Sequence, residues 1–215
     1  MKRYFIYLFL VAISLQLSAQ QIKVDIFDDL EYQSENGQYK ANLKKNIFDD
    51  LVFSDNNNNE LTFRKKYLEI ENKILLEDEE ARIDFFRHLI RRYRSEEKYK
   101  ASFSVNIFDD IVIEDNRNNK IKKGTDIFGH PVYEEKFNGV ETTIKRDLSG
   151  NPEYKSGKEQ ATLKKDIFNK WIYQDSSGNK FEFSDQTWNS LMDQYGSDEN
   201  ILYFLINEFL YNYKY

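Results

Sequence analysis

Carboxylates and carboxamides at close spacing are the residues best suited to chemistry in this sequence. Asp55, Asn57 and Asn59 alternate along an asparagine run, with an oxygen spacing similar to that of a calcium loop. The sequence lacks the sharp-turn glycine and the distal glutamate of a full loop, and Arg117 places a cation in the corresponding run after Asp115. Because aspartate and asparagine favour turns, we interpret these runs as turns and predict neither a metal nor a cofactor.

Adjacent carboxylates offer a second chemistry, that of the acid and the nucleophile of a glycosidase. Neighbouring strand residues face opposite sides of a sheet, so such a pair is poorly placed around one substrate. The pair also recurs, which favours a structural role because one catalytic site needs one pair. The pairs are Asp28-Asp29, Asp49-Asp50 and Asp109-Asp110.

Other catalytic groups are scarce. The 215 residues include no cysteine and two histidines, which excludes a thiolate nucleophile, a disulfide framework and a histidine-rich metal site. His130 lies in a Phe-Gly-His-Pro step where a related segment has Asn151, so we interpret it as a polar turn residue. His88 lies among arginines, where we expect the solvated face of a helix.

Aromatic and basic side chains are the candidates for partner binding. Aromatic residues make up 16% of the chain, and exposed rings such as Trp171 and Tyr173 can stack on sugars or contact another chain. Arg87 and Arg91 lie in a basic helix end that suits an acidic partner. The alternation of apolar residues predicts that most rings belong to the core, and basic runs of this kind are usually solvated.

An internal repeat organises these residues. One octet, exemplified by NIFDDLVF, starts at Asp25, Asn46, Asn106, Asp126, Asp147 and Asp166. Neighbouring starts are roughly 20 residues apart, except for one interval of roughly 60 residues between Asn46 and Asn106. The chain is therefore built from a short repeat unit, and a segment of about two unit lengths is inserted once.

Apolar and polar residues alternate around the octets, which predicts short strands with one buried face. Each unit is expected to contain two strands, one turn inside the octet and one turn at the Asp-Asn run. Gly129 and Gly150, each followed by a proline two residues later, suit the first turn. The residues expected on the buried face before the octet are Ala41, Leu43 and Ile47, and also Ala161, Leu163 and Ile167.

A larger symmetry relates residues 39–94 to residues 159–214 at an offset of 120. After Phe63 and after Phe183 the apolar period changes from two to that of a helix. Each change predicts a short helix followed by a longer one, and we expect Asp185 to cap the third helix. The four helices are expected over residues 66–75, 79–94, 186–195 and 198–213.

These elements predict an α+β fold. Tandem β-hairpin repeats form a meander or a flattened solenoid, and two helical pairs pack on the sheet or cap it. The predicted segments are a signal peptide at 1–19, two repeat units at 20–63, a helical insertion at 64–98, four repeat units at 99–183 and a C-terminal helical pair at 184–215.

The element Tyr173-x-Asp175-x-x-Gly178-Asn179, which lies in one of these short repeat units, resembles the tyrosine–aspartate repeats of bacterial RHS-type envelope proteins. The resemblance covers Val24–Phe63 and Asn106–Phe183, about half the chain. It departs from the family pattern because one residue separates the tyrosine from the aspartate. The resemblance implies stacked hairpins, and six units are too few for the encapsulating shell of that family.

The segment Met1–Ala19 is typical of a secretory signal. Lys2 and Arg3 precede the apolar stretch Tyr4–Leu15, and cleavage is expected after Ala19, an uncleaved anchor being the alternative. Removing Lys2 and Arg3 from the 31 basic residues leaves 29 against 37 acidic ones, a net charge of −8. Such a charge is unsuited to binding nucleic acid.

We therefore predict an exported, non-enzymatic binding or scaffold protein of the periplasm or the extracellular space. Its expected partner is an envelope or extracellular protein or a polysaccharide, and exposed edge strands permit self-association. One alternative is a carbohydrate-active or calcium-dependent enzyme that uses the turn carboxylates. Alanine replacement of Asp49, Asp109 or Asp110 would distinguish it. A second alternative is an immunity-type partner of a secreted toxin.

Overall fold

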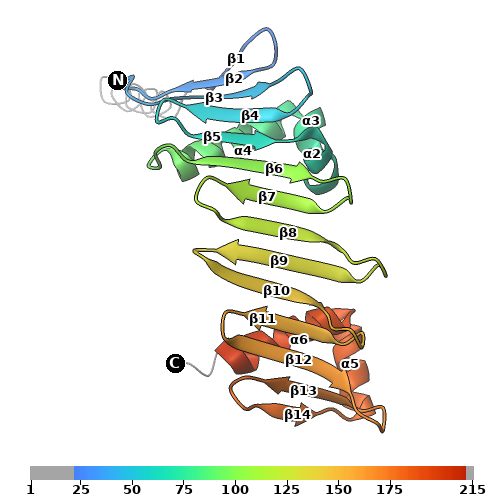
Figure 1. Ribbon diagram of the computed structural model, residues 1–215. Coiled ribbons are helices and arrows are strands. Elements are labelled where there is room, and N and C mark those ends of the chain that lie inside the picture. Colours follow the sequence, from blue (N-terminus) through green and yellow to red (C-terminus); the bar gives the residue numbers. More distant parts are fainter. Residues whose placement is uncertain (1–21, 212–215) are drawn as a thin grey trace, which may run out of the picture. The chain divides into compact units, whose positions relative to one another are not determined.

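The computed structural model describes residues 22–211, which form two compact units divided after Lys100. The expected signal peptide lies outside the described residues. In each unit every strand pairs antiparallel with the next strand along the chain (Figure 1). The structure is thus an α+β hairpin meander, which decides between the two architectures that the sequence left open. None of the described helices is long and apolar enough to cross a bilayer.

The described residues of the first unit, from Ile22 on, form a five-stranded meander with three helices. Alternate residues such as Leu43, Phe53 and Leu61 are fully buried, as the period of two predicts. Phe86 of the longest helix packs edge-on against Phe53, with ring centroids 6.1 Å apart. The elements are β1 (Ile22–Val24), β2 (Leu30–Gln33), β3 (Lys40–Lys45), β4 (Leu51–Asp55), β5 (Glu60–Phe63), α2 (Lys65–Glu71), α3 (Ile74–Glu77) and α4 (Glu79–Tyr93).

Helix α4 of the first unit begins where charge and capping favour it. Asp78 accepts a hydrogen bond from the Ala81 N–H at the start of α4, and Arg91 and Arg92 lie in its last turn. Arg64 precedes α2 without a side-chain cap. The single short helix expected here is divided into α2 and α3 at Asn72 and Lys73.

The second unit consists of a nine-stranded meander followed by helices. Its strands are β6 (Lys100–Val105), β7 (Ile111–Asp115), β8 (Lys120–Thr125), β9 (Pro131–Phe137), β10 (Val140–Arg146), β11 (Pro152–Ser156), β12 (Glu159–Lys165), β13 (Trp171–Asp175) and β14 (Lys180–Glu182). Its helices are α5 (Asp185–Tyr195), α6 (Asp198–Leu205) and the π-helical turn η1 (Ile206–Tyr211).

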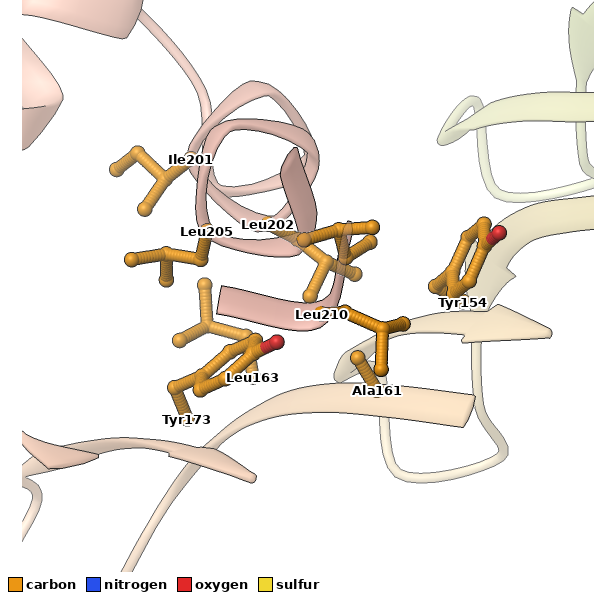
Figure 2. Packing of buried hydrophobic residues seen from close by; sticks show 9 residues of the cluster. Tyr154, Ala161, Leu163, Tyr173, Ile201, Leu202, Leu205 and Leu210 are labelled. Carbon is orange, nitrogen blue, oxygen red and sulfur yellow. The ribbon is translucent and has the colours of Figure 1, made fainter. Parts of the chain in front are cut away.

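The core of the second unit lies between the last strands and the helices. Leu163 and Tyr173 point from β12 and β13 toward Leu202 of α6 and Leu210 of η1 (Figure 2). All four side chains are almost completely inaccessible to solvent. Ser184 caps α5 and Ser197 caps α6. The expected cap Asp185 is wrong by one residue, because the Ser184 hydroxyl accepts the Thr187 N–H and Asp185 is already helical.

Strands β6–β10 are much less covered. Ala101 is their only buried apolar residue within the described part of the chain. Lys122 bridges Asp110 and Glu134 at 3.5 and 3.7 Å. The aliphatic stems of such long side chains shield the sheet while their charged ends remain in water.

Ile47 and Ile167 do not lie on the buried face. The preceding strands end at Lys45 and Lys165, and both isoleucines are in turns, with more than nine-tenths of their surface exposed. The alternation of apolar residues predicted that each strand extends to the isoleucine, two residues beyond its observed end.

Candidate functional site: exposed apolar turns

Six five-residue turns share one hydrogen-bonding pattern; we call them the tip turns. In each, the first residue donates its N–H to the carbonyl of the fifth, and the fourth donates its N–H to the carbonyl of the first. A side-chain oxygen of the first residue accepts the N–H groups of the third and fifth residues at 2.7 to 3.0 Å. The tip turns begin at Asp25, Asn46, Asn106, Asp126, Asp147 and Asp166.

The fourth residue of every tip turn has a left-handed backbone, with φ between 61° and 83°. Glycine, asparagine and aspartate tolerate this conformation better than other residues. The residues are Asp28, Asp49, Asp109, Gly129, Gly150 and Asn169. The recurrent aspartate at this position is therefore explained by backbone conformation.

Side chains of the first and fifth residues close four of the turns. Asn46 donates to Asp50 at 3.1 Å, Asn106 donates to Asp110 at 2.9 Å, and Asn151 donates to Asp147. His130 contacts Asp126 at 3.0 Å in the same way. Each pair joins one carboxylate to one group that can donate, which confirms His130 as a polar turn residue.

Hydrogen bonding lowers the pKa of two of these turn carboxylates, Asp126 and Asp147. Burial raises the pKa of Asp126, but hydrogen bonds from His130 and from the Phe128 N–H outweigh it, and the pKa lies below its usual value. The pKa of Asp147 is lowered in the same way by its hydrogen bonds from Asn151 and Ser149. The turn carboxylates therefore act as fixed acceptors for their own backbone.

The second and third residues of the tip turns are large, apolar and exposed. Five of the turns carry Ile-Phe, the isoleucines being 89 to 93% exposed and the phenylalanines 66 to 77%. In the remaining turn Leu148 is completely exposed and is followed by Ser149. Exposed apolar groups of this size have to be explained by something other than packing in the described chain.

Alternate turns of a meander lie on the same side of it (Figure 1). In the second unit, four tip turns join β6 to β7, β8 to β9, β10 to β11 and β12 to β13. We call their apolar residues the tip row: Ile107, Phe108, Ile127, Phe128, Leu148, Ile167 and Phe168. The first unit carries Ile26-Phe27 and Ile47-Phe48 on one side of its own meander.

The opposite side of each meander provides an internal comparison. Turns that begin at Asp55, Asp115 and Asp175 use the same side-chain hydrogen bonds from their third and fifth residues. Their fourth residues, Asn58, Asn118 and Gly178, also have positive φ. We call these the distal turns. Their second and third residues are polar, so this backbone does not require isoleucine or phenylalanine.

The residues that resembled a calcium loop hold a helix end. Asp55 accepts the N–H groups of Asn57 and Asn59 at 2.9 and 3.0 Å. The Asn59 amide donates to the carbonyl oxygens of Tyr93 and Glu96, where α4 ends, and accepts the Tyr99 N–H. Within residues 22–211, no group of three or more acidic or histidine side chains could hold a metal ion.

The paired carboxylates also make structural contacts. Asp50 is buried and accepts hydrogen bonds from the Arg64 side chain and from the Lys65 N–H at the start of α2. Asp49 pairs with the Lys65 ammonium at 2.9 Å. Asp110 is buried against Gly124, where an added Cβ would overlap its carboxylate. These contacts explain the carboxylates without a substrate.

The predicted partner-binding residues have different environments. Trp171 is half-buried and stacks on Trp188, with centroids 4.2 Å apart. Tyr173 is completely buried and donates its hydroxyl to Asp175, so its assignment as a binding ring is wrong: the residue belongs to the core. Arg87 is exposed and pairs with Asp84, while Arg91 is exposed at the end of α4.

An open groove of about 810 Å³ lies between β8–β11 and α6–η1. Tyr154 and Tyr211, which line it, are hydrogen-bonded through their hydroxyls. Tyr133 donates to Glu135, and burial together with this carboxylate raises the pKa of Tyr133 to about 12. The polar groups named here are thus engaged with one another, and the tip turns remain the stronger candidate site.

The tip row was missed in the sequence because isoleucines such as Ile47 and Ile167 were assigned to the buried face of the preceding strand. The available signal was the residue after each pair, which is aspartate, glycine or asparagine and marks a turn. No family model matches the sequence, and neither a curated protein nor a solved structure is significantly similar to it.

Proposed function

We propose that this chain is an exported, non-enzymatic binding or scaffold protein whose tandem hairpin units present apolar turns to a partner. The observation that carries the proposal is the contrast between tip turns and distal turns. In both, a side-chain oxygen of the first residue accepts the N–H groups of the third and fifth residues, yet only the tip turns carry large apolar side chains. The apolar residues are therefore not needed to form the turn.

Burial of the tip side chains by a partner is energetically favourable. Burying an isoleucine or a phenylalanine stabilises a complex by about 1.5–3 kcal/mol before the costs of association are subtracted. The second unit offers three Ile-Phe pairs and Leu148, all left in water. A partner that covers them gains a hydrophobic contribution which the isolated chain forgoes.

Tandem repetition accounts for the regular placement of these turns. All six octets begin with a tip turn. The fifth residue of this turn is aspartate in three of them and histidine, asparagine or lysine in the others. Repeat arrays present extended surfaces in this way. Export to the periplasm or the extracellular space is the setting suggested by the sequence of Met1–Ala19.

Site-specific crosslinking tests this function. A photoreactive benzoylphenylalanine is placed at Phe128 in a tip turn or at Ser177, the same position of a distal turn, in cells that make the protein. We expect adducts from position 128 and few from position 177. Equal yields at the two positions, or no adduct from either, would overturn the proposal.

A further inference from the structure

We propose that the occupant of the tip row is the surface of a phospholipid bilayer, which the Ile-Phe side chains enter. The inference rests on the proposed binding function and names the partner of the same site. It depends on three properties of the second unit: the spacing of the tips, the hydrogen bonding of their backbone, and the cations beside them.

The tips are separate protrusions. Neighbouring strands lie about 4.8 Å apart, so tips two strands apart are spaced by about 10 Å. A folded protein partner would need a matching series of pockets, each shaped for one pair of side chains. A fluid hydrocarbon surface accepts isolated apolar side chains wherever they protrude, as it does for interfacial aromatic and aliphatic residues.

The backbone of each tip is prepared for removal from water. In the turn at Asp126, the N–H groups of Asp126, Phe128, Gly129 and His130 all donate within the turn, at 2.8 to 2.9 Å. Unsatisfied backbone groups are costly in an apolar medium. These four donors are already bonded, so they need no new partner when the tip enters lipid.

Exposed lysines lie beside three of the four apolar tips, those at Asp126, Asp147 and Asp166. Lys123 and Lys145 are the third and second residues before their turns, and Lys164 and Lys165 directly precede Asp166. All four side chains are exposed, whereas Asp126, Asp147 and Asp166 accept hydrogen bonds from their own turns. Lysines on flexible stems can reach lipid phosphates while the neighbouring rings enter the apolar layer.

Vesicle binding by the full mature chain tests the inference. The probe is a suspension of phosphatidylethanolamine and phosphatidylglycerol vesicles, and the readout is co-sedimentation. The tip variant is I127S/F128S/I167S/F168S, which copies Ser176-Ser177 of a distal turn. The matched control is F137S/V140S, which removes exposed apolar side chains from the opposite side. We expect the tip variant to bind at least about tenfold more weakly and the control to bind like the parent.

A second measurement does not depend on loss of binding. A tryptophan at position 128 (F128W) should shift its emission to the blue on vesicle addition and be quenched by brominated lipid, whereas F137W should not change. Absence of vesicle binding, or equal weakening of the tip variant and the control, would overturn the lipid assignment. A mass in solution that is twice that of one chain, and that is halved in the tip variant, would instead identify a second copy as the occupant.

The two proposals fail separately. If position 128 crosslinks to a protein or a polysaccharide while vesicles are ignored, the binding function stands and the lipid surface is the wrong occupant. If vesicles are ignored and position 128 gives no adduct, both proposals fail. Circular dichroism of each variant shows whether the fold has been kept.

Discussion

The buried side-chain amide of Asn59 connects a distal turn to the end of helix α4. Its amide bonds the carbonyl oxygens that end α4, and its oxygen accepts the Tyr99 N–H. Asn119 occupies the same position of another distal turn, where it bonds Asp115 and the Asn138 N–H and holds no helix. The same turn asparagine is therefore expected to contribute more to the stability of the first unit than to that of the second.

We expect N59A to destabilise the first unit by about 1–3 kcal/mol, because it removes three hydrogen bonds to part-buried backbone groups of Tyr93, Glu96 and Tyr99. N119A, the matched control, should cost less. Hydrogen exchange of peptides from β4 and β5 measures the first effect, and peptides from β7 and β8 measure the second. Equal loss of protection in the two variants would show that the hydrogen bonds from Asn59 to the end of α4 do not account for the loss of stability in N59A.

Asp50 makes the first unit sensitive to acid. Burial raises the pKa of Asp50, but the Lys65 N–H, Asn46 and Arg64 outweigh it, and the pKa falls below the usual value. A carboxyl with a depressed pKa contributes stability that is present above its unfolded value and is lost as pH falls through its folded value.

We therefore expect D50N to lower stability at neutral pH and to flatten the loss of stability below about pH 5. Urea unfolding followed by hydrogen exchange in α2 measures both effects. The control is D49N, which breaks the exposed pair of Asp49 with Lys65. Its effect should disappear at high salt, whereas that of D50N persists because Asp50 is buried.

At the scale of the element, the tip turn forms with different side chains at its fifth position. In the first unit, the tip-turn residue Asp50 accepts the Lys65 N–H at the start of α2. In the second unit, α5 is capped by Ser184, the residue directly before it. The position equivalent to Asp50 is Lys170, which pairs with Glu182 instead. The turn thus tolerates different fifth residues because its hydrogen bonds depend mainly on the first.

The tip side chains should be dispensable for folding. We expect I167S/F168S to change the melting temperature very little, because both side chains are exposed and surface substitutions usually shift stability by less than about 0.5 kcal/mol. The reciprocal variant S176I/S177F should also fold and should increase the binding of a hydrophobic dye. A large fall in melting temperature in I167S/F168S would mean that the pair packs on the protein.

At the scale of the molecule, each unit has its own core and its own helices. Trp171 and Trp188, the two tryptophans of the chain, both lie in the second unit, so intrinsic fluorescence reports on that unit. Leu163 is completely buried in its core (Figure 2).

We expect L163A to lower the stability of the second unit by about 2–5 kcal/mol, through lost transfer energy and a residual cavity. Tryptophan fluorescence in urea measures this change. Hydrogen exchange at Leu43 and Phe53, buried in the first unit, serves as the control and should be unaltered. Loss of protection in both units would show that their cores unfold together.

The proposed export leads to a prediction for the whole chain. We expect the protein recovered from the cell envelope or the medium to begin at Gln20, because a signal segment of this kind is cleaved after a small residue. N-terminal sequencing measures this directly. A chain that still begins with Met1 in the membrane fraction would favour the uncleaved anchor.

The strands, the turns between them and the approximate helix positions were predictable because they follow from local patterns, whereas the choice between a meander and a solenoid was decided by the strand pairing. A period of two marks a sheet with one covered face, a helical period marks α4 and α6, and asparagine or glycine marks a turn. The location of Tyr173 in the core and the helix contact of Asn59 were not predictable, because both depend on which distant segment packs above them.

The fate of the Ile-Phe pairs was decided only in three dimensions. Hydrophobicity favours burial of these residues, and in one dimension Ile47 continues the alternation of Ala41 and Leu43. In the folded chain the side-chain oxygen of Asn46 accepts backbone N–H groups and closes the turn, which carries Ile47 beyond the last covered strand position. Local composition thus dictated where strands, turns and helices form, whereas exposure depended on whether another element reached the same place.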